Sequence, residues 1–179
     1  MRKLWIFSCV MLLSGCNYFQ SEKIPVSTSE AQSAKALMYN TKNELIGEIT
    51  FKETDEGVEL TTNLENLKPG KHGIHLHEVG KCQAPTFETA GAHFNPTKKQ
   101  HGIDNPLGPH KGDLPNIEVD QAGKVQVSFV TADFTLKKGQ PTSIFDADGT
   151  SIVIHENIDD YKTDPSGNSG ARIACGVIE

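Results

Sequence analysis

The sequence predicts an all-β fold, an antiparallel Greek-key sandwich or barrel, and three observations support this prediction. Apolar and polar residues alternate along short segments, which is the pattern of half-buried strands. Turn-forming Gly, Pro, Asn and Asp residues separate these segments. No segment has the apolar spacing of an amphipathic helix, and no internal repeat is present. Short strands joined by such turns are typical of sandwiches and barrels.

The strands are predicted in the following order. Alternation covers residues 34–54 and 57–66, with turn signals at 40–43 and 55–57. Lys68-Pro-Gly70 introduces the next strand, which carries His75 and His77. Further short strands are predicted at 117–119, 124–134, 151–155 and 171–178.

A long loop is predicted between two of these strands. Residues 79–115 form a stretch of 37 residues without strand or helix periodicity, a length typical of either disorder or a functional loop. Cys82 lies near the start of this stretch, and four candidate metal ligands lie along it. Since such ligands could clamp the segment in place of an apolar core, we expect a functional loop.

The histidines form an ordered series that indicates a site for two metal ions. His75 and His77 are two apart on a strand, so their side chains share a face about 6.6 Å apart and can converge on one ion. Imidazoles of this kind suit a redox metal. A single histidine is more often an ordinary core or surface residue, but six of the seven histidines belong to the series. The series is His75, His77, His93, His101, His110 and His155.

A second set of candidate ligands lies within the long loop. His93, His101, His110 and Asp113 supply three imidazoles and one carboxylate, separated by intervals of eight, nine and three residues. Such a set closes a tetrahedral zinc site and leaves no open position. The sequence therefore predicts a structural zinc.

Five motifs along the chain strongly resemble those of the copper/zinc superoxide dismutases, and they occur in the order of that family. The resemblance covers about residues 34–178 and implies an eight-stranded β-sandwich or barrel with long metal-binding and substrate-channel loops. The motifs are Gly73-Ile-His-Leu-His-Glu78, Gly91-Ala-His-Phe-Asn-Pro96, His101-Gly102, His110-Lys-Gly-Asp-Leu-Pro115 and Gly170-Ala-Arg-Ile-Ala-Cys-Gly176.

The resemblance also implies which residues bind each metal. His93 is expected to bridge the two ions and to handle a proton. Copper is expected to be bound by His75, His77, His93 and His155, and zinc by His93, His101, His110 and Asp113. The implied reaction is the disproportionation of superoxide to dioxygen and hydrogen peroxide, with copper as the redox metal.

Further residues match family positions outside the ligand set. Asp159 is expected to link His75 and His101 by hydrogen bonds, although Asp160 beside it is an alternative. Arg172 matches the arginine that orients the superoxide anion beside copper, and both Arg172 and His93 are therefore candidate catalytic residues. Lys162 is a candidate for steering the substrate, whereas His72 matches a structural position.

The start of the chain has the character of a bacterial lipoprotein signal. Basic residues precede an apolar run from Leu4 to Leu13, which is about half the length that a membrane-spanning helix needs. Leu13-Ser-Gly-Cys16 resembles a lipobox, which predicts a signal peptide at 1–15, lipidation of Cys16 and anchorage to a membrane. An ordinary cleavage site is the alternative, and export follows from both.

The rest of the chain divides into a tether and one domain. Residues 16–33 include a polar segment without periodicity, and we expect a flexible tether there. Residues 34–179 are expected to form the superoxide dismutase-like domain.

The four cysteines are expected to differ in chemical state. Cys9 lies in the signal peptide and Cys16 is the expected lipid site, which leaves Cys82 and Cys175. In an exported protein this pair is expected to form a disulfide, in preference to two free thiols or zinc ligation.

Charge excludes one class of partner. Removal of residues 1–15 takes away Arg2 and Lys3 and no acids, which leaves 15 basic and 23 acidic residues and a formal charge of −8. Nucleic acid is therefore not an expected partner. The sequence makes no prediction of the oligomeric state.

Two alternatives of different function remain within this fold. One is a catalytically weak metal-binding or metal-storage lipoprotein, and the other is a copper-only form. The first predicts lost copper ligands and has no need of Arg172, whereas the second predicts missing zinc ligands. Because every position is filled, we expect an active enzyme.

Overall fold

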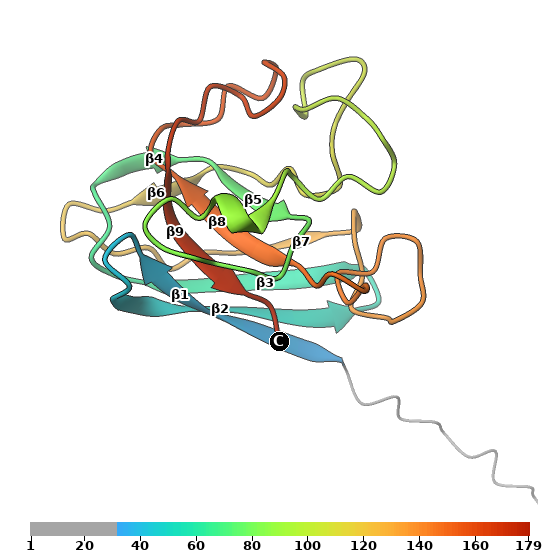
Figure 1. Cartoon of the computed structure of the whole chain (residues 1–179), viewed down its shortest axis with the longest axis horizontal. Helices are drawn as coiled ribbons and strands as arrows, with labels where there is room; N and C mark the ends of the chain where they lie inside the picture. The colour runs from blue at the N-terminus through green and yellow to red at the C-terminus, as the bar shows by residue number, and fades with distance from the viewer. Residues whose placement is uncertain (1–31) are drawn as a thin grey trace, which may run out of the picture.

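The computed structural model describes residues 32–179, which form an antiparallel β-structure with one short 3-10 turn (Figure 1). The predicted signal peptide, the lipidation site Cys16 and nearly all of the tether lie outside the described residues. The elements are β1 (Ser33–Asn40), β2 (Leu45–Thr54), β3 (Gly57–Leu64), β4 (Gly70–His72), β5 (Ile74–His77), η1 (Glu88–Ala90), β6 (Ile117–Val119), β7 (Ser128–Thr131), β8 (Ser151–His155) and β9 (Arg172–Val177).

The strands form one curled sheet of seven and a small sheet of two. The larger sheet has the order β5-β8-β9-β1-β2-β3-β7, and β4 pairs with β6. The pairs β1–β9 and β3–β7 join strands that are distant in the chain, as Greek-key connections do. The predicted all-β, antiparallel fold class is therefore confirmed.

The described residues contain nine strands rather than the predicted eight, because the segment that carries His75 and His77 is divided. At Gly73 the backbone leaves the pairing with β6: its N–H donates to Asn157 O at 2.8 Å and its carbonyl accepts from His155 N at 2.8 Å. β5 then pairs with β8 instead. The predicted strand at 124–134 is also interrupted, since Val125 makes a single bridge to Leu64 and regular pairing covers only β7.

The core follows the alternation seen in the sequence. Every second residue of β1, namely Ala34, Ala36 and Met38, is buried, while the residues between them are exposed. All residues of β5 and β8 are buried, because loops cover the face that these strands turn away from the core. These two strands carry three of the predicted copper ligands.

Two long loops lie on the side of β5 and β8 that faces away from β1 to β3 (Figure 1). They connect β5 to β6 and β8 to β9, and they touch where His101 N donates to Asp164 Oδ1 at 2.7 Å. Between Ser33 and Glu179 no helix has the length and apolar character needed to cross a bilayer.

Candidate metal centre

The strand β5 places the first two histidines. Both side chains are fully buried, and β5 pairs with β8 so that His75 lies opposite Val153 and His77 opposite Ser151. The loop after β5 folds back along its free edge: Phe94 N donates to Leu76 O at 2.8 Å, and Leu76 N donates to Gly112 O at 2.9 Å. The backbone at the predicted loop ligands is therefore held against β5 by regular hydrogen bonds.

A β-bulge places His155. The register between β8 and β9 shifts after Ile154, and His155 then lies opposite Arg172. Because a bulge turns a side chain out of the regular alternation, it can aim the imidazole toward the β5 histidines. The ring centroid of His155 lies 4.8 Å from that of His75 and 5.7 Å from that of His77.

Four ring nitrogens in this cluster are buried and make no hydrogen bond. The opposite nitrogen of each ring faces an acceptor. His75 Nε2 lies 2.7 Å from Asp159 Oδ2, His77 Nδ1 lies 3.0 Å from Gly91 O, His155 Nδ1 lies 3.2 Å from Gly170 O, and His93 Nδ1 faces Asp113. The nitrogen that faces the acceptor carries the N–H, so the other nitrogen presents a lone pair. The unpartnered atoms are His75 Nδ1, His77 Nε2, His93 Nε2 and His155 Nε2.

These four residues can hold one metal ion. One candidate ligand atom from each of them lies within 4.8 Å of all the others. A buried nitrogen without a hydrogen-bond partner is costly, and a metal ion is a partner that four convergent lone pairs fit. Imidazole is a suitable ligand for copper.

The electrostatics of the cluster keep its imidazoles neutral. Burial, with the neighbouring histidines, lowers the pKa of His155 to about 3. Burial also lowers the pKa of His93 to about 4, although Asp113 acts in the opposite direction. The pKa of His77 lies well below its usual value, mainly because of burial. At neutral pH these rings are therefore neutral, and the nitrogen of each ring that faces the cluster carries a lone pair.

A second set of ligand atoms surrounds the carboxylate of Asp113. Its Oδ1 lies 3.0 Å from His93 Nδ1, 3.0 Å from His101 Nδ1 and 3.2 Å from His110 Nδ1. Three imidazole nitrogens and one carboxylate oxygen are a donor set that suits tetrahedral zinc. Burial would raise the pKa of Asp113, but the hydrogen bonds from the three histidines outweigh it and hold the pKa far below its usual range.

Both His75 and His110 lie close to the other atoms of this second set. The atoms that lie within 4.8 Å of one another come from His75, His93, His101 and Asp113. However, Asp159 occupies one nitrogen of His75, and the other belongs to the first cluster. His110 Nδ1 lies 3.4 Å from His93 Nδ1 and 3.2 Å from Asp113 Oδ1, so it can supply the fourth ligand atom of this set.

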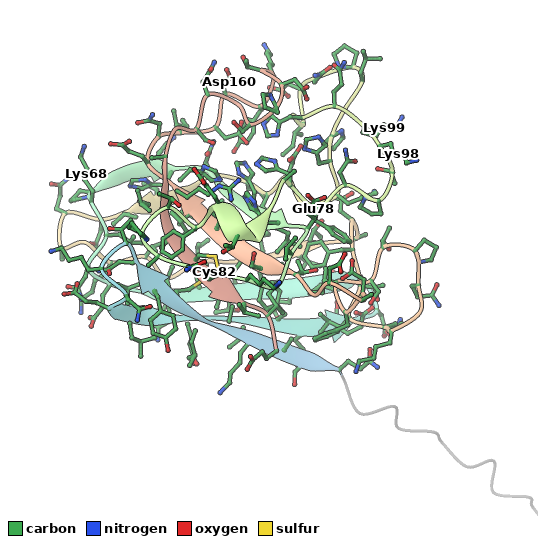
Figure 2. The ribbon with its side chains drawn as sticks, viewed as in Figure 1. Lys68, Glu78, Cys82, Lys98, Lys99 and Asp160 are labelled. Atoms are coloured by element: carbon green, nitrogen blue, oxygen red, sulfur yellow. A yellow bond between two sulfur atoms is a disulfide. The ribbon has the colours of Figure 1, made fainter. Side chains whose placement is uncertain are left out.

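Asp159, and not Asp160, lies between the two sets. Its two oxygens contact His75 Nε2 at 2.7 Å and His101 Nε2 at 3.0 Å. Gly167 packs so tightly on this carboxylate that a Cβ would overlap it. Asp160 is exposed at the outer end of the loop between β8 and β9, where it accepts hydrogen bonds from Lys162 N and Thr163 N (Figure 2).

His101 differs from the other histidines because both of its ring nitrogens face carboxylates. Burial lowers its pKa, but hydrogen bonds to Asp113 and Asp159 outweigh burial and raise the pKa to about 9. Without metal, His101 is therefore protonated at neutral pH, and a metal bound at Nδ1 must displace that proton.

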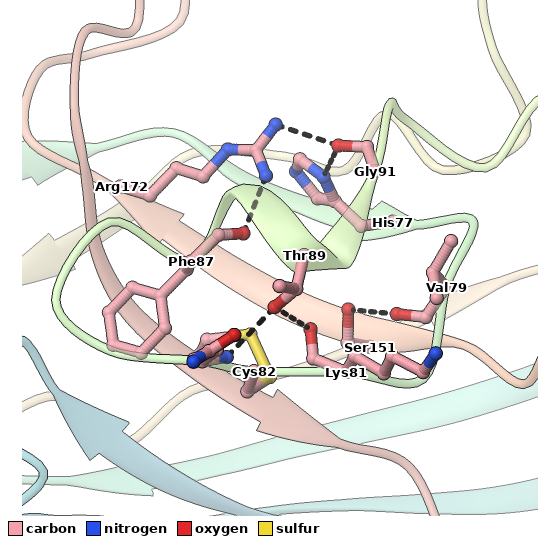
Figure 3. The surroundings of a disulfide bond; sticks show 11 residues. His77, Val79, Lys81, Cys82, Phe87, Thr89, Gly91, Ser151 and Arg172 are labelled. Carbon is pink, nitrogen blue, oxygen red and sulfur yellow. Dashed lines mark hydrogen bonds between the residues drawn. A yellow bond between two sulfur atoms is a disulfide. The ribbon is translucent and has the colours of Figure 1, made fainter.

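Arg172 is fixed beside the first cluster by two carbonyl oxygens (Figure 3). Its Nη1 donates to Phe87 O and its Nη2 donates to Gly91 O, both at 2.7 Å. Gly91 O also accepts a hydrogen bond from His77 Nδ1, so one carbonyl oxygen orients both the guanidinium and a candidate copper ligand. The side chain is half-buried, which leaves part of the guanidinium open to an anion.

Cys82 and Cys175 form the predicted disulfide, with Cα atoms 5.6 Å apart. Around it pack the buried side chains of Phe87, Ala90 and Val153. The bond attaches the start of the loop that follows β5 to β9 (Figure 3).

The other predicted residues lie outside the two ligand sets. Lys162 is exposed, on the loop between β8 and β9. His72 is buried, and its two ring nitrogens lie 2.8 Å from His155 O and 2.8 Å from Lys68 O. It therefore supports the backbone at the end of β8.

Several groups that shape the site had no signal in the sequence. The carbonyl oxygens of Gly91 and Gly170 select which nitrogen of His77 and of His155 carries the proton. Asn116 and Tyr161 make hydrogen bonds around Asp159. The glycines belong to recognisable motifs, but a backbone acceptor role depends on local geometry that residue spacing does not encode.

Comparison with known proteins agrees with this geometry. The family model described as copper/zinc superoxide dismutase (SODC) matches residues 45–178. "Superoxide dismutase [Cu-Zn] 2" of Aquifex aeolicus is 48% identical over 156 residues, which cover 87% of this chain and 91% of the relative.

Two solved structures have the same fold. The crystal structure of a SOD-like protein from Bacillus subtilis is similar with a TM-score of 0.78 at 48% identity, covering 80% of this chain and 96% of that one. The Cu/Zn superoxide dismutase from Brucella abortus has a TM-score of 0.67 at 30% identity, covering 83% and 100% of the two chains. The chain belongs to the copper/zinc superoxide dismutase family.

Proposed function

We propose a set of ligands for each metal of this copper- and zinc-dependent superoxide dismutase. The enzyme converts two superoxide anions and two protons to dioxygen and hydrogen peroxide. The proposed copper ligands are His75, His77, His93 and His155. The proposed zinc ligands are His93, His101, His110 and Asp113.

The single observation that carries this assignment is the set of four buried ring nitrogens without a hydrogen-bond partner. They converge from two strands and a loop, and a buried polar atom of this kind requires a partner. Copper bound there supplies a one-electron redox couple, and zinc beside it supplies a fixed positive charge.

His93 is the residue that joins the two sites. Its Nε2 belongs to the copper set, while its Nδ1 lies 3.0 Å from Asp113 Oδ1 in the zinc set. An imidazole offers a nitrogen to each of two metals only when it has lost both protons. We assign to His93 Nε2 the holding and release of a proton during turnover, while the Asp113 side keeps the ring in place.

Arg172 attracts and orients the substrate. Two of its five N–H groups are used by Phe87 O and Gly91 O, which fix the guanidinium plane and leave other N–H groups for an anion. Since the mature chain is acidic overall, a local positive charge is needed to bring superoxide to the site.

A metal-storage role is less well supported than catalysis. Storage needs ligands alone, whereas this chain combines the complete ligand set with a guanidinium held beside it. A copper-only enzyme would not need the imidazole nitrogens that lie around Asp113 Oδ1.

A pair of variants tests the assignment. His155→Ala is expected to lose copper and all turnover while it retains zinc, and His110→Ala is expected to lose zinc while it retains copper. Metal analysis of the purified, metal-loaded proteins and a superoxide assay give the readouts. Full activity in the His155→Ala protein would show that the copper site is assigned wrongly.

The disulfide Cys82–Cys175 indicates an exported protein. We further propose that Cys16 carries the lipid that anchors the domain to a bacterial membrane, which the apolar run and Leu13-Ser-Gly-Cys16 support. Cell fractionation of a Cys16→Ser variant checks this: the variant is expected to leave the membrane fraction, and continued association would count against lipidation.

A further inference from the structure

Tyr161 makes three hydrogen bonds to three different parts of the metal centre. Its backbone N–H donates to Asp159 Oδ1 at 2.7 Å. Its carbonyl oxygen accepts from Asp104 N at 2.9 Å, in the loop that carries the zinc ligands. Its hydroxyl oxygen accepts from Asn116 N at 2.7 Å, three residues after Asp113.

Asn116, Asp159 and Tyr161 form a closed network of hydrogen bonds. Its Nδ2 donates to Asp159 O at 2.9 Å, and its Oδ1 accepts from Asp159 N at 2.9 Å. The side-chain amide thus holds the Asp159 backbone from both sides of the residue. With the two bonds from Tyr161, four hydrogen bonds tie these three residues together.

The backbone of Tyr161 has an unusual conformation that these bonds maintain. Its φ is 63°, in the left-handed region that a bulky residue rarely occupies, so surrounding contacts must hold it there. Gly102, with φ of 108°, packs directly against the Tyr161 carbonyl oxygen, and a Cβ at Gly102 would overlap that oxygen. Such strain is typical of positions that serve a functional geometry.

We propose that Tyr161 is a positioning residue that holds the Asp159 carboxylate between a copper ligand and a zinc ligand, an inference that rests on the proposed function. Through its hydroxyl it connects the segment that follows Asp113 to the loop that carries Asp159. Through its N–H it orients Asp159 Oδ1, the oxygen that faces His101 Nε2 at 3.0 Å.

Orientation of Asp159 matters because it fixes two rings at once. Asp159 accepts from the Nε2 atoms of His75 and His101, so it determines where the Nδ1 atoms of both rings point. Partners of metal ligands that act in this way affect metal affinity by about 10- to 100-fold. Tyr161 acts through Asp159, and we expect an effect of about tenfold, at the lower end of that range.

The test replaces Tyr161 by phenylalanine, which removes only the hydroxyl. Tyr161→Phe is expected to weaken zinc binding about tenfold, measured by competition with a zinc chelator. Tyr39→Phe is the matched control: Tyr39 lies on β1, and its hydroxyl makes no hydrogen bond within residues 32–179. The control is expected to bind zinc as the wild type does.

A background variant separates positioning from a merely structural role. In a protein that already carries Asp159→Asn, Tyr161→Phe is expected to change zinc affinity no further, because its effect passes through that carboxylate. The visible absorption of cobalt bound in place of zinc is expected to change in Tyr161→Phe and not in Tyr39→Phe. Additive losses in the double variant, or an unchanged cobalt spectrum, would overturn the proposal.

A second variant covers the case in which Tyr161→Phe does not fold. Asn116→Asp removes the Nδ2 donor to Asp159 O and is expected to weaken zinc binding in the same way. Zinc binding by the wild type that does not depend on His110 would defeat the proposed function. Wild-type zinc binding at His110, together with unchanged affinity in Tyr161→Phe, would defeat only the role of Tyr161. If Tyr161→Phe does not fold, unchanged affinity in Asn116→Asp would show that the network through which Tyr161 acts does not position Asp159, and would defeat that role as well.

Discussion

At the scale of single residues, the site is defined by which nitrogen of each imidazole has a partner. Three rings donate a hydrogen bond from one N–H to a fixed acceptor, which is Asp159 Oδ2, Gly91 O or Gly170 O. The opposite nitrogen then faces the centre of the cluster with its lone pair. This arrangement selects tautomers before any metal binds, so the ligands need little rearrangement.

Replacement of Arg172 is expected to slow the reaction with superoxide. Arg172→Gln keeps a hydrogen-bond donor but removes the charge, and we expect kcat/KM for superoxide to fall by about tenfold or more. Arg172→Lys keeps the charge but cannot reproduce both bonds to Phe87 O and Gly91 O, so an intermediate rate is expected. Fast kinetics at several ionic strengths, with metal content matched, provide the measurement.

The salt dependence gives this prediction a second check. The wild-type rate is expected to fall as salt screens the attraction of Arg172, whereas the glutamine variant is expected to lose that dependence. If both proteins had equal rates and equal salt dependence, Arg172 would have no role in attracting the substrate.

The sequence predicts which residues lie together better than it predicts their contacts. The structure brings His75-x-His77 and the loop series around His93 into two neighbouring clusters, while their roles as metal ligands stay a prediction. The choice between Asp159 and Asp160 required coordinates, because adjacent residues point in different directions and only one is buried. The role of Tyr161 was not predictable from the sequence, since its contacts depend on a left-handed backbone conformation that no motif indicates.

At the scale of elements, alternation predicts the long strands well and the interrupted ones poorly. β1, β3 and the part of β2 from Ile49 onward follow the expected pattern because each has one face on the core and one toward solvent, whereas the start of β2 contains a register shift. The division between β4 and β5 was not predictable: Gly73 bonds to the chain just after β8, and that partner is distant in the sequence. The two interrupted regions therefore depend on tertiary contacts.

The loop between β5 and β6 provides the first prediction at this scale. Removal of both metals is expected to increase amide hydrogen exchange most strongly between His93 and Asp113, because coordinate bonds replace an apolar core there. The start of the loop remains attached through the disulfide, and the amides of β1 to β3 act as an internal reference. Hydrogen exchange with and without a chelator gives the comparison, and equal protection of the loop would refute the idea.

Glu53 on β2 provides a pH prediction away from the metals. Its side chain accepts from Leu136 N at 2.7 Å and from Thr135 Oγ1 at 2.9 Å, which fastens β2 to the loop after β7. Burial raises the pKa of Glu53, but these hydrogen bonds outweigh it and place the pKa below its ordinary value. The ionised carboxylate therefore stabilises the folded state.

The sign of the pH effect follows from this lowered pKa. The contribution of Glu53 is present above its unfolded pKa of about 4.3, and it is lost as pH falls through the lower folded pKa. Glu53→Gln is expected to lower the free energy of unfolding by about 1–2 kcal/mol at pH 7 and by less at acidic pH. Denaturant unfolding at both pH values is the measurement, with Glu48→Gln on the same strand as control; an equal loss at both would contradict the assignment.

At the scale of the whole molecule, the disulfide and the metal centre hold the loops after β5 and β8 against the sheet. The bond joins residues 93 positions apart, and the chain-entropy model assigns about 4–5 kcal/mol to a loop of this length. The loops after β5 and β8 meet where His101 N donates to Asp164 Oδ1, and both lie on the side of β5 and β8 that faces away from β1 to β3 (Figure 1). Long-range order in this region therefore depends on covalent and coordinate bonds as well as on burial.

The proposed mechanism depends on the ring of His93 joining both metals. A crystal structure of the fully metal-loaded protein, with data collected at the copper and zinc absorption edges, tests it most directly. This structure is expected to contain one copper and one zinc with His93 as their only shared ligand, Nε2 toward copper and Nδ1 toward zinc. Two separate centres with no ligand in common would contradict it.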